Sequence, residues 1–241
     1  MVERPGERGS RGDVYVVASG RPWNRTLATR LQARTGFRFE QISEREDLTG
    51  VRLAALNPRF VFVPHWSHRI APDVYDRYEC VVFHMTDVPF GRGGSPLQNL
   101  VVRGHATTVI SALRCGAELD AGSVYLRKPL CLHGSAEEIF VRADAIIEDM
   151  IVEILEREPI PAPQVGEPTV FRRRTRADGA LSGKMTLEQV YDHIRMLDAE
   201  GYPPAFVEVG RLRFEFTRVG RRADRLEACV TIRAAEKDSR A

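Results

Sequence analysis

The sequence lacks the features of a membrane protein, a secreted protein or a zinc protein. None of its apolar runs approaches the roughly 18 residues that a membrane-spanning helix needs. The charged, glycine-containing start at 1–13 holds no apolar segment of the kind found in signal peptides. The four cysteines form no Cys-x-x-Cys pair and have no histidine at zinc-ligand spacing. We therefore expect a cytoplasmic protein with reduced cysteines and no metal site.

An excess of one charge is also lacking. The 35 basic and 33 acidic residues leave a formal net charge of +2, which is too small to indicate nucleic-acid binding. Hydrophobic residues make up 43% of the chain and charged residues 28%, values that are ordinary for a globular protein with a core. Neither nucleic acid nor a membrane is expected as a partner.

Strand-like and helix-like patterns alternate along the first third of the chain. Short apolar runs predict strands at 13–19, 37–43, 59–67 and 79–85, and helical spacing predicts helices between them at 24–36, 47–57 and 70–78. This alternation predicts an α/β fold with a Rossmann-like parallel sheet, mixed at its edge, and helices on both faces. Such sheets bind ligands at the carboxyl ends of their strands. The polar residues there should line one edge, and they are Ser19, His65, Trp66, His84 and Thr86.

The rest of the chain suggests a larger domain followed by a small one. Strands are expected at 107–115 and 123–132, and capping pairs predict helices that begin after Ser95 (with Gln98), Ser135 (with Glu138) and Thr186 (with Gln189). We expect a disordered leader at 1–12, a catalytic domain at 13–156, a linker or extended arm at 157–184 and a small C-terminal helix and β unit at 185–235. The basic run at 172–176 is either a solvated surface or a site for phosphates.

One stretch in the middle of the chain combines several unusual elements. It reads VVFHMTDVPFGRGGSPLQNLVVRG and is followed by GAELDAGSVY. It resembles the central signature of the formyl-tetrahydrofolate-dependent formyltransferases, the family of methionyl-tRNA formyltransferase-like enzymes. The matching positions are His84, Thr86, Val88-Pro89, Arg92-Gly93, Pro96, Gly104 and Leu119-Asp120-Ala121-Gly122. Downstream, FRRR and IRMLDAEGYPPAF resemble the amino-sugar N-formyltransferase branch.

The resemblance implies an activity and a set of site residues. It implies transfer of a formyl group from N10-formyltetrahydrofolate to an amine of a small molecule, with a nucleotide-linked amino sugar as the favoured acceptor. His84 would act as the base and Asp120 as its partner. The formyl donor would lie along Thr86, Val88, Pro89, Arg92, Gly93, Leu113, Gly116 and Leu119. The resemblance is also compatible with a homodimer.

The chemistry of this reaction asks for a proton acceptor and for a hydrogen-bond donor. When an amine attacks a formyl carbon, a base must take a proton, which suits a histidine, and the oxygen gains negative charge that needs placed donors. The family carries an asparagine two residues before the histidine, but this chain has Val82 there. Candidate replacements are His65, Trp66 or the backbone of the Gly-Arg-Gly-Gly loop at 91–94.

Val82 keeps other interpretations open. The formyl group could pass to water, a related one-carbon acyl transfer could occur, or the chain could bind folate or a nucleotide without turnover. The individual residues also have structural alternatives. His84 could be a satisfied structural residue, Asp120 could form an Asx turn, and Arg92 could lock its loop instead of binding an anion.

Overall fold

The computed structural model describes residues 13–235, so the leader expected at 1–12 lies outside the described residues. The chain forms two compact units whose segments interleave along the sequence. The first holds the residues up to 93, 108–130 and 141–170, and the second holds 94–107, 131–140 and 171 onwards. The boundaries expected from the sequence, 13–156, 157–184 and 185–235, stay a prediction. No helix among the described residues is long and apolar enough to cross a membrane.

A six-stranded sheet forms the centre of the first unit. Its strands are β1 (Val14–Ala18), β2 (Arg38–Ile42), β3 (Phe60–Pro64), β4 (Glu79–His84), β6 (Thr107–Arg114) and β7 (Val124–Cys131). Their order is β2-β1-β3-β4-β6-β7, with the first four parallel and β6 antiparallel to β4. The predicted parallel sheet with a mixed edge is confirmed.

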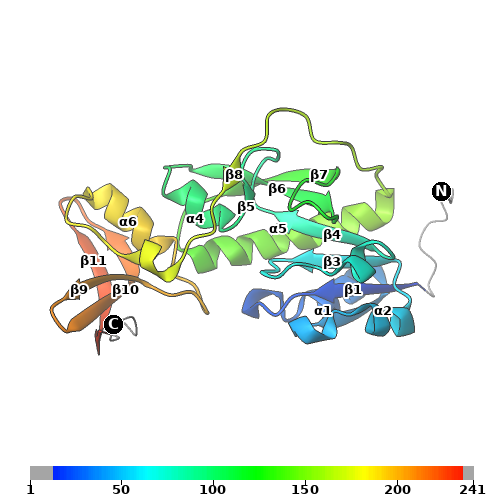
Figure 1. Ribbon diagram of the computed structural model, residues 1–241, viewed down its shortest axis with the longest axis horizontal. Coiled ribbons are helices and arrows are strands. Elements are labelled where there is room, and N and C mark those ends of the chain that lie inside the picture. Colours follow the sequence, from blue (N-terminus) through cyan, green and yellow to red (C-terminus); the bar gives the residue numbers. More distant parts are fainter. Residues whose placement is uncertain (1–12, 236–241) are drawn as a thin grey trace. The chain divides into compact units, whose positions relative to one another are not determined.

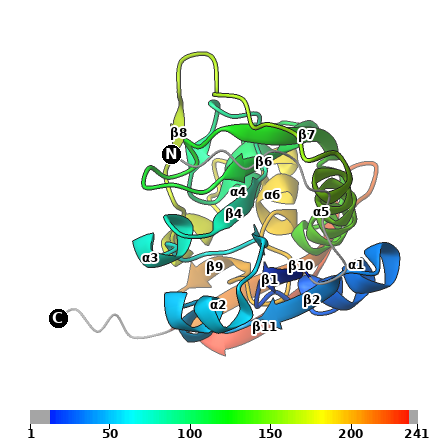
Figure 2. The same ribbon diagram turned by 90° about the vertical axis from the view of Figure 1, so that its right-hand side faces the viewer.

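Helices cover both faces of this sheet (Figures 1 and 2). Helix α1 (Leu27–Thr35) and the later part of α5 (Ala136–Arg157) lie on one face, and α2 (Gly50–Leu56) and α3 (Pro72–Tyr75) lie on the other. Side chains that alternate along β1 and β3 pack against α2 and α3. Helix α1 ends at Gly36, whose φ of 73° is the left-handed conformation that glycine adopts without strain. The arrangement confirms the predicted layers.

The strand order places a change of direction at β1. From β1 the chain crosses to β2 on one side and then to β3 on the other, which makes the β1/β3 crevice a topological switch point. The carboxyl ends of β1, β3 and β4 lie side by side here, because the register pairs Val17 with Phe62 and Pro64 with Phe83. Open α/β sheets bind their ligands at such a point.

The segment predicted as a linker or arm is an extended arm with specific contacts. Ala162 exchanges backbone hydrogen bonds with Val124 of β7. Further along, the backbone N–H of Thr169 donates to the carbonyl of Pro89. These contacts hold the segment between 159 and 169 against the first unit.

The second unit contains a small sheet and two short helices. These are β9 (Ala205–Val209), β10 (Leu212–Arg221) and β11 (Leu226–Ala234), with α4 (Pro96–Val101) and α6 (Leu187–Arg195). Helix α6 packs against β10. Thr186 and Gln189 form the predicted capping box of α6, and Ser135 and Glu138 form that of α5. Two short strands, β5 (Arg92–Gly93) and β8 (Val170–Phe171), pair separately.

The predicted helix begins after Ser95, with Ser95 at its N-cap and Pro96 in its first turn, but the predicted capping hydrogen bonds of Ser95 and Gln98 are absent. Ser95 precedes α4 but has a φ of 51°, and its side chain makes no capping hydrogen bond. Its Oγ instead accepts from the backbone N–H of Arg174, and the Gln98 amide donates to the carbonyl of Met196. The local sequence resembles a capping box, but contacts distant in sequence use both side chains. Helix α4 ends at Val101.

Candidate active site

His84 and Asp120 lie together at the carboxyl edge of the sheet. His84 is the last residue of β4, and Asp120 lies in the loop between β6 and β7. His84 Nδ1 is 3.5 Å from Asp120 Oδ2, and the two side chains are 7% and 12% exposed. His84 Nε2 is 2.8 Å from the carbonyl oxygen of Gly91. Two residues that lie 36 positions apart therefore form one nearly buried pair.

These two contacts determine where the imidazole holds its proton. A carbonyl oxygen only accepts, so the Gly91 contact requires a proton on Nε2. In the neutral ring, Nδ1 then has a lone pair that faces the carboxylate of Asp120. The lone pair and the carboxylate repel each other. A proton on Nδ1 replaces this repulsion with a charge-assisted contact. The pair is therefore built to take up one proton between Nδ1 and the carboxylate.

The backbone of the 91–94 loop is used to hold this pair. Gly93 N–H donates to Asp120 Oδ2 at 2.9 Å, and Gly91 N–H donates to Thr169 Oγ1 at 2.8 Å. The N–H groups of Arg92 and Gly94 also donate, to the carbonyls of Thr169 and Phe171. All four N–H groups of the loop thus have partners within the chain. A loop N–H could stabilise a developing oxyanion only after losing one of these bonds.

The loop that carries Asp120 has a tight backbone. Asp120 has a φ of 54°, a conformation that aspartate tolerates better than most residues. At Gly122 a Cβ atom would lie 1.8 Å from the carbonyl oxygen of Arg114, so no other residue fits. The Leu-Asp-x-Gly spacing therefore has a local physical cause, because the glycine allows the chain to fold back onto the end of β6.

Gln164 supports this loop from the arm, and no pattern in the sequence indicates this role. Its Nε2 donates to the carbonyls of Asp120 and Gly122, both at 2.8 Å. Its Oε1 accepts from Nε and Nη2 of Arg92, while Nη1 of Arg92 binds Glu118. Arg92 thus locks its own loop onto the Asp120 loop. Gln164 lies 44 residues beyond Asp120 in a segment without a motif, so only the fold reveals the contact.

The residues expected to contact the formyl donor differ in exposure. The side chains of Thr86, Val88 and Leu113 are buried, and Thr86 Oγ1 donates to the carbonyl of Gly91 at 3.4 Å. Pro89 follows a cis peptide bond and is partly exposed, while Gly116 and Leu119 are exposed. The buried side chains of Thr86, Val88 and Leu113 can only shape this surface from below.

Val82 has an apolar environment. It is partly buried and packs against two apolar clusters, one of which contains Val88, Leu113 and Val124. The register pairs it with Val63 of β3 and Leu113 of β6. An asparagine amide at this position would face these apolar neighbours. The valine is therefore consistent with its surroundings, and a donor has to come from another element.

His65 is a polar candidate at the end of the neighbouring strand. It directly follows Pro64 of β3, which pairs with Phe83 beside His84. Trp23 Nε1, which can only donate, lies 3.1 Å from His65 Nδ1, so the proton of the neutral ring is on Nε2. Burial and then the charge of Arg21 lower the His65 pKa to about 3. His65 is therefore a neutral donor at physiological pH.

His65 and Trp66 line an open depression at the switch point. The cavity measures about 380 Å³, and its walls come from the residues that follow β1, β2 and β3. The lining residues are Gly20, Arg21, Ser43, Glu44, Arg45, Glu46, His65, Trp66, Ser67 and His68. Arg21 Nη2 donates to Ser67 Oγ at 2.6 Å, which ties two of these strand ends together. His84 and Asp120 are not among the lining residues.

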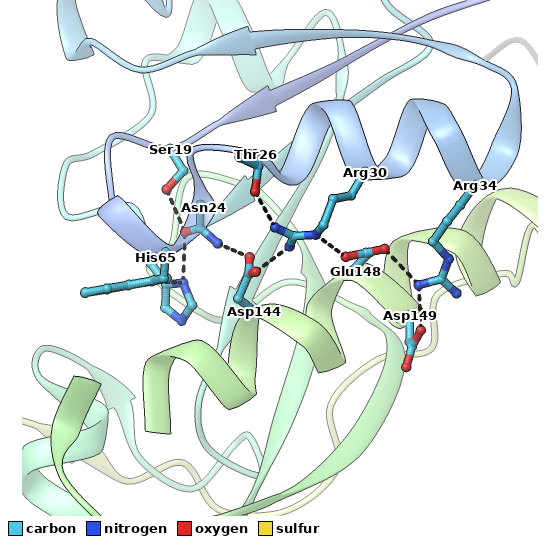
Figure 3. A network of polar contacts seen from close by, with 10 residues as sticks. Ser19, Asn24, Thr26, Arg30, Arg34, His65, Asp144, Glu148 and Asp149 are labelled. Carbon is cyan, nitrogen blue, oxygen red and sulfur yellow. Dashed lines mark hydrogen bonds and ion pairs between the residues drawn. The ribbon is translucent and has the colours of Figure 1, made fainter. Parts of the chain in front are cut away.

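A network of polar side chains contacts His65 through Asn24 (Figure 3). Asn24 Oδ1 is 3.2 Å from His65 Nδ1 and accepts from Ser19 Oγ, while its amide donates to Asp144 of α5. Asp144 and Glu148 then bind Arg30 of α1. Burial raises the pKa of Asp144, an effect that Arg30 and Asn24 oppose. The network connects α1, α5 and the ends of β1 and β3.

Comparisons with known proteins identify the family and the fold. Residues 176–233 match the family model described as the methionyl-tRNA formyltransferase C-terminal domain. A solved structure described as methionyl-tRNA formyltransferase from Clostridium thermocellum is 41% identical, with a TM-score of 0.91, and the match covers 92% of this chain and 100% of that one. HypX from Aquifex aeolicus, solved with tetrahydrofolic acid, shares only the fold, at 16% identity and a TM-score of 0.69 over 85% of this chain and 37% of HypX.

The match to curated sequences is more partial. The methionyl-tRNA formyltransferase of Wolinella succinogenes is 26% identical over 163 residues, which are 65% of this chain and 53% of that protein. This chain therefore spans about half the length of the curated relatives it matches. The similarity to the Clostridium thermocellum structure extends over that whole protein chain. The chain belongs to the formyl-tetrahydrofolate-dependent formyltransferase family.

Proposed function

We propose that this protein transfers a formyl group from N10-formyltetrahydrofolate to a primary amine. The observation that carries the proposal is the nearly buried His84–Asp120 pair, with Nδ1 and Oδ2 3.5 Å apart at the carboxyl edge of the sheet. The donor would bind along the 86–93 loop and the 113–119 segment, where Pro89, Gly116 and Leu119 are accessible. Membership of the family supports the same donor.

The pair supplies the proton transfer that the reaction needs. The amine nitrogen forms a bond to the formyl carbon, the bond from that carbon to the folate nitrogen breaks, and one proton moves from the amine to that nitrogen. Gly91 holds the proton on His84 Nε2, so the vacant positions for the moving proton are His84 Nδ1 and the Asp120 carboxylate. Proton transfer by such positioned groups contributes about 10²- to 10⁴-fold to a rate.

The negative charge on the formyl oxygen needs a donor in place of the missing asparagine. His65 is our first candidate, because it is a neutral N–H donor at the neighbouring strand end. Trp66, which directly follows it, is the second. A donor that stays neutral suits this task at any pH above its own pKa, and the removal of one such donor costs about 10²- to 10³-fold in rate.

For the acceptor we propose an amino sugar linked to a nucleotide. The depression of about 380 Å³ at the switch point supports a small-molecule acceptor, because small-molecule pockets begin at about this size. Arg21 and Arg45 line it and would suit phosphate groups. The aromatic face of Trp66 would suit a base or sugar ring.

Two other functions have specific support. The names of the relatives favour methionyl-tRNA as the acceptor, as does the family model over 176–233. Val82 favours folate binding without turnover, because a site with fewer oxyanion donors would slow both transfer to an amine and hydrolysis by water. Hydrolysis, in which water replaces the amine, remains an outcome that the same assay detects.

The test is incubation of the purified protein with 10-formyltetrahydrofolate. Parallel reactions contain no acceptor, a panel of nucleotide-linked amino sugars, or methionyl-tRNA, and both tetrahydrofolate and formylated product are measured. Transfer to an amino sugar predicts loss of the formyl donor only with that acceptor. Loss without any acceptor would establish hydrolysis, and formylated methionyl-tRNA alone would establish the tRNA as acceptor. Absence of any folate binding would refute the proposal.

Variants of the pair test its role. His84→Ala and Asp120→Ala should abolish turnover and leave the circular dichroism spectrum unchanged. Asp120→Asn keeps an oxygen that can accept from Gly93 N–H but removes the charge, and we expect a loss of at least about 100-fold. The matched control is Asp149→Asn, an exposed aspartate on α5, which should retain the rate. Wild-type turnover in either alanine variant would refute the assignment.

A further inference from the structure

Two of the four cysteines lie opposite each other on neighbouring strands of the large sheet. Strands β4 and β6 are antiparallel neighbours (Figure 1), and their register pairs Val81 with Arg114. One position further along, the backbone N–H of Cys115 donates to the carbonyl of Cys80 at 2.7 Å. Residues paired in this way have Cα atoms about 5.5 Å apart, within the range of about 4.4–6.8 Å that a disulfide spans. The backbone therefore brings the two cysteines within reach of a covalent bond.

Both thiols lie on the same face of the sheet. Directly opposed residues of an antiparallel pair share a face, and both cysteines pack against one apolar cluster, which includes Val61 and Val63 of β3. Cys80 is 1% exposed, whereas Cys115 is half-buried. An oxidant can therefore reach Cys115 from solvent, and Cys80 is the shielded thiol opposite it.

Cys115 lies at the base of the loop that carries Asp120. It directly follows β6, and the backbone N–H of Arg114 donates to the carbonyl of Ser123 at 2.8 Å, so the two ends of the loop meet there. Gly122 also approaches the carbonyl of Arg114 so closely that a Cβ atom would not fit. A displacement of Cys115 therefore moves the support of the Asp120 loop.

We propose that Cys80 and Cys115 form a reversible disulfide that displaces the Asp120 loop and lowers turnover. Opposed residues of antiparallel strands have Cβ atoms about 4.5–5.5 Å apart, whereas a disulfide holds them about 3.8 Å apart, so the bond pulls them together by about 1 Å. Cys80 lies within a central strand, so Cys115, just after the end of β6, makes most of this movement. The effect on the rate rests on the proposed function, whereas the formation of the bond does not.

The reaction needs an oxidant that accepts two electrons, and an azo compound is one such class. The Cys115 thiolate adds to one nitrogen of the azo group. The sulfur of Cys80 then attacks the sulfur of Cys115 and displaces a hydrazine. The two thiols lose two electrons and two protons in total, and the azo group takes up both. A disulfide strained by this movement is easily reduced, so a thiol such as dithiothreitol should reverse the step.

Burial makes the pair slow to react at neutral pH. It raises the pKa of both thiols, that of Cys115 to about 11, and a hydrogen bond from the Gly116 backbone opposes the rise at Cys115. The charged and titratable side chains around the pair are Glu79, Arg114, Asp120 and Tyr125. Because the thiolate is the reacting form, the rate of bond formation should rise about tenfold per pH unit between pH 7 and pH 9.

The test uses the full chain with Cys131→Ser and Cys229→Ser, which removes the two exposed cysteines. Oxidation at pH 9 with diamide, an azo compound, should lower the mass of the protein by two hydrogen atoms. A non-reducing digest should contain one linked pair of peptides, which hold Cys80 and Cys115. Turnover of 10-formyltetrahydrofolate should then fall at least about tenfold, because a displacement of about 1 Å can cost about 10²-fold in rate. Dithiothreitol should restore it.

Cys80→Ala in the same background is the matched control. It keeps Cys115 but cannot form the bond, so it should retain the rate of the reduced protein and be insensitive to diamide, with circular dichroism as a check of its fold. Absence of the link between Cys80 and Cys115 would overturn the proposal, and so would a linked protein with an unchanged rate. If the reduced protein shows no turnover with any acceptor, the proposed function fails, and the digest still decides whether the disulfide forms.

Discussion

His65 gives a stability prediction that can be worked out from its environment. Its pKa is about 3 in the folded protein and 6.5 in an unfolded chain. The folded state therefore takes up the proton less readily, so the contribution is fully present above pH 6.5 and is lost as pH falls towards 3. Between pH 7 and pH 5 the full shift corresponds to about 2 kcal/mol. Because His65 as a residue is partly exposed, we expect about 1–2 kcal/mol from this group.

The measurement compares urea unfolding at pH 7 and pH 5 for the wild type and two variants. His65→Gln can still accept from Trp23 Nε1 but does not titrate, so it should lose about 1–2 kcal/mol less than the wild type on acidification. His68→Gln, an exposed neighbour, should lose as much as the wild type. Buried His193, whose pKa is lowered by burial, contributes equally to all three proteins. If His65→Gln and the wild type lose the same free energy of unfolding between pH 7 and pH 5, the assignment of His65 as a neutral donor is refuted.

Three further predictions test the supports of the site. Gly122→Ala should abolish turnover and destabilise the fold, because its Cβ would meet the Arg114 carbonyl, whereas Gly116→Ala meets nothing within 4 Å and should leave stability unchanged; thermal unfolding and rates compare them. Gln164→Ala should lower kcat about tenfold or more by loosening the Asp120 loop, with exposed Val165→Ala as control, and an unchanged rate would refute this support. Asp144→Ala should cost about 1–3 kcal/mol in denaturant unfolding, because the buried Asn24 amide loses its acceptor while Arg30 keeps Glu148, and an unchanged stability would contradict that reasoning.

The sheet could be predicted because it depends on periodic signals, whereas the pairing of His84 with Asp120 was expected from the family resemblance. Alternating strands and helices specify the parallel sheet, and the end of an apolar run at His84 specifies the edge where ligands bind. The Leu-Asp-x-Gly spacing around Asp120 reflects the close approach at Gly122. These features need no knowledge of distant contacts.

The supports of the site depend on contacts far apart in the sequence, and no local pattern indicates them. Gln164 lies in an arm with no periodicity, yet it joins two loops. The same reason explains the error at Ser95, whose hydroxyl could cap a helix but accepts from Arg174 instead. Where a polar side chain has several partners within reach, the tertiary structure selects one of them.

The neighbours of Val82 suit an apolar side chain, although the family carries a polar asparagine at this position. A buried amide needs its hydrogen bonds satisfied, and around Val82 the neighbours are Val63 and Leu113. The polar groups near the strand ends are instead concentrated one strand away, where Trp23 donates to His65 Nδ1, and burial and the charge of Arg21 keep His65 neutral. If His65 donates to the formyl oxygen, a donor placed at position 82 should compensate for the loss of the donor at position 65. Val82→Asn should rescue part of the rate lost in His65→Ala, and the absence of any rescue would indicate that the two positions do not serve the same oxygen.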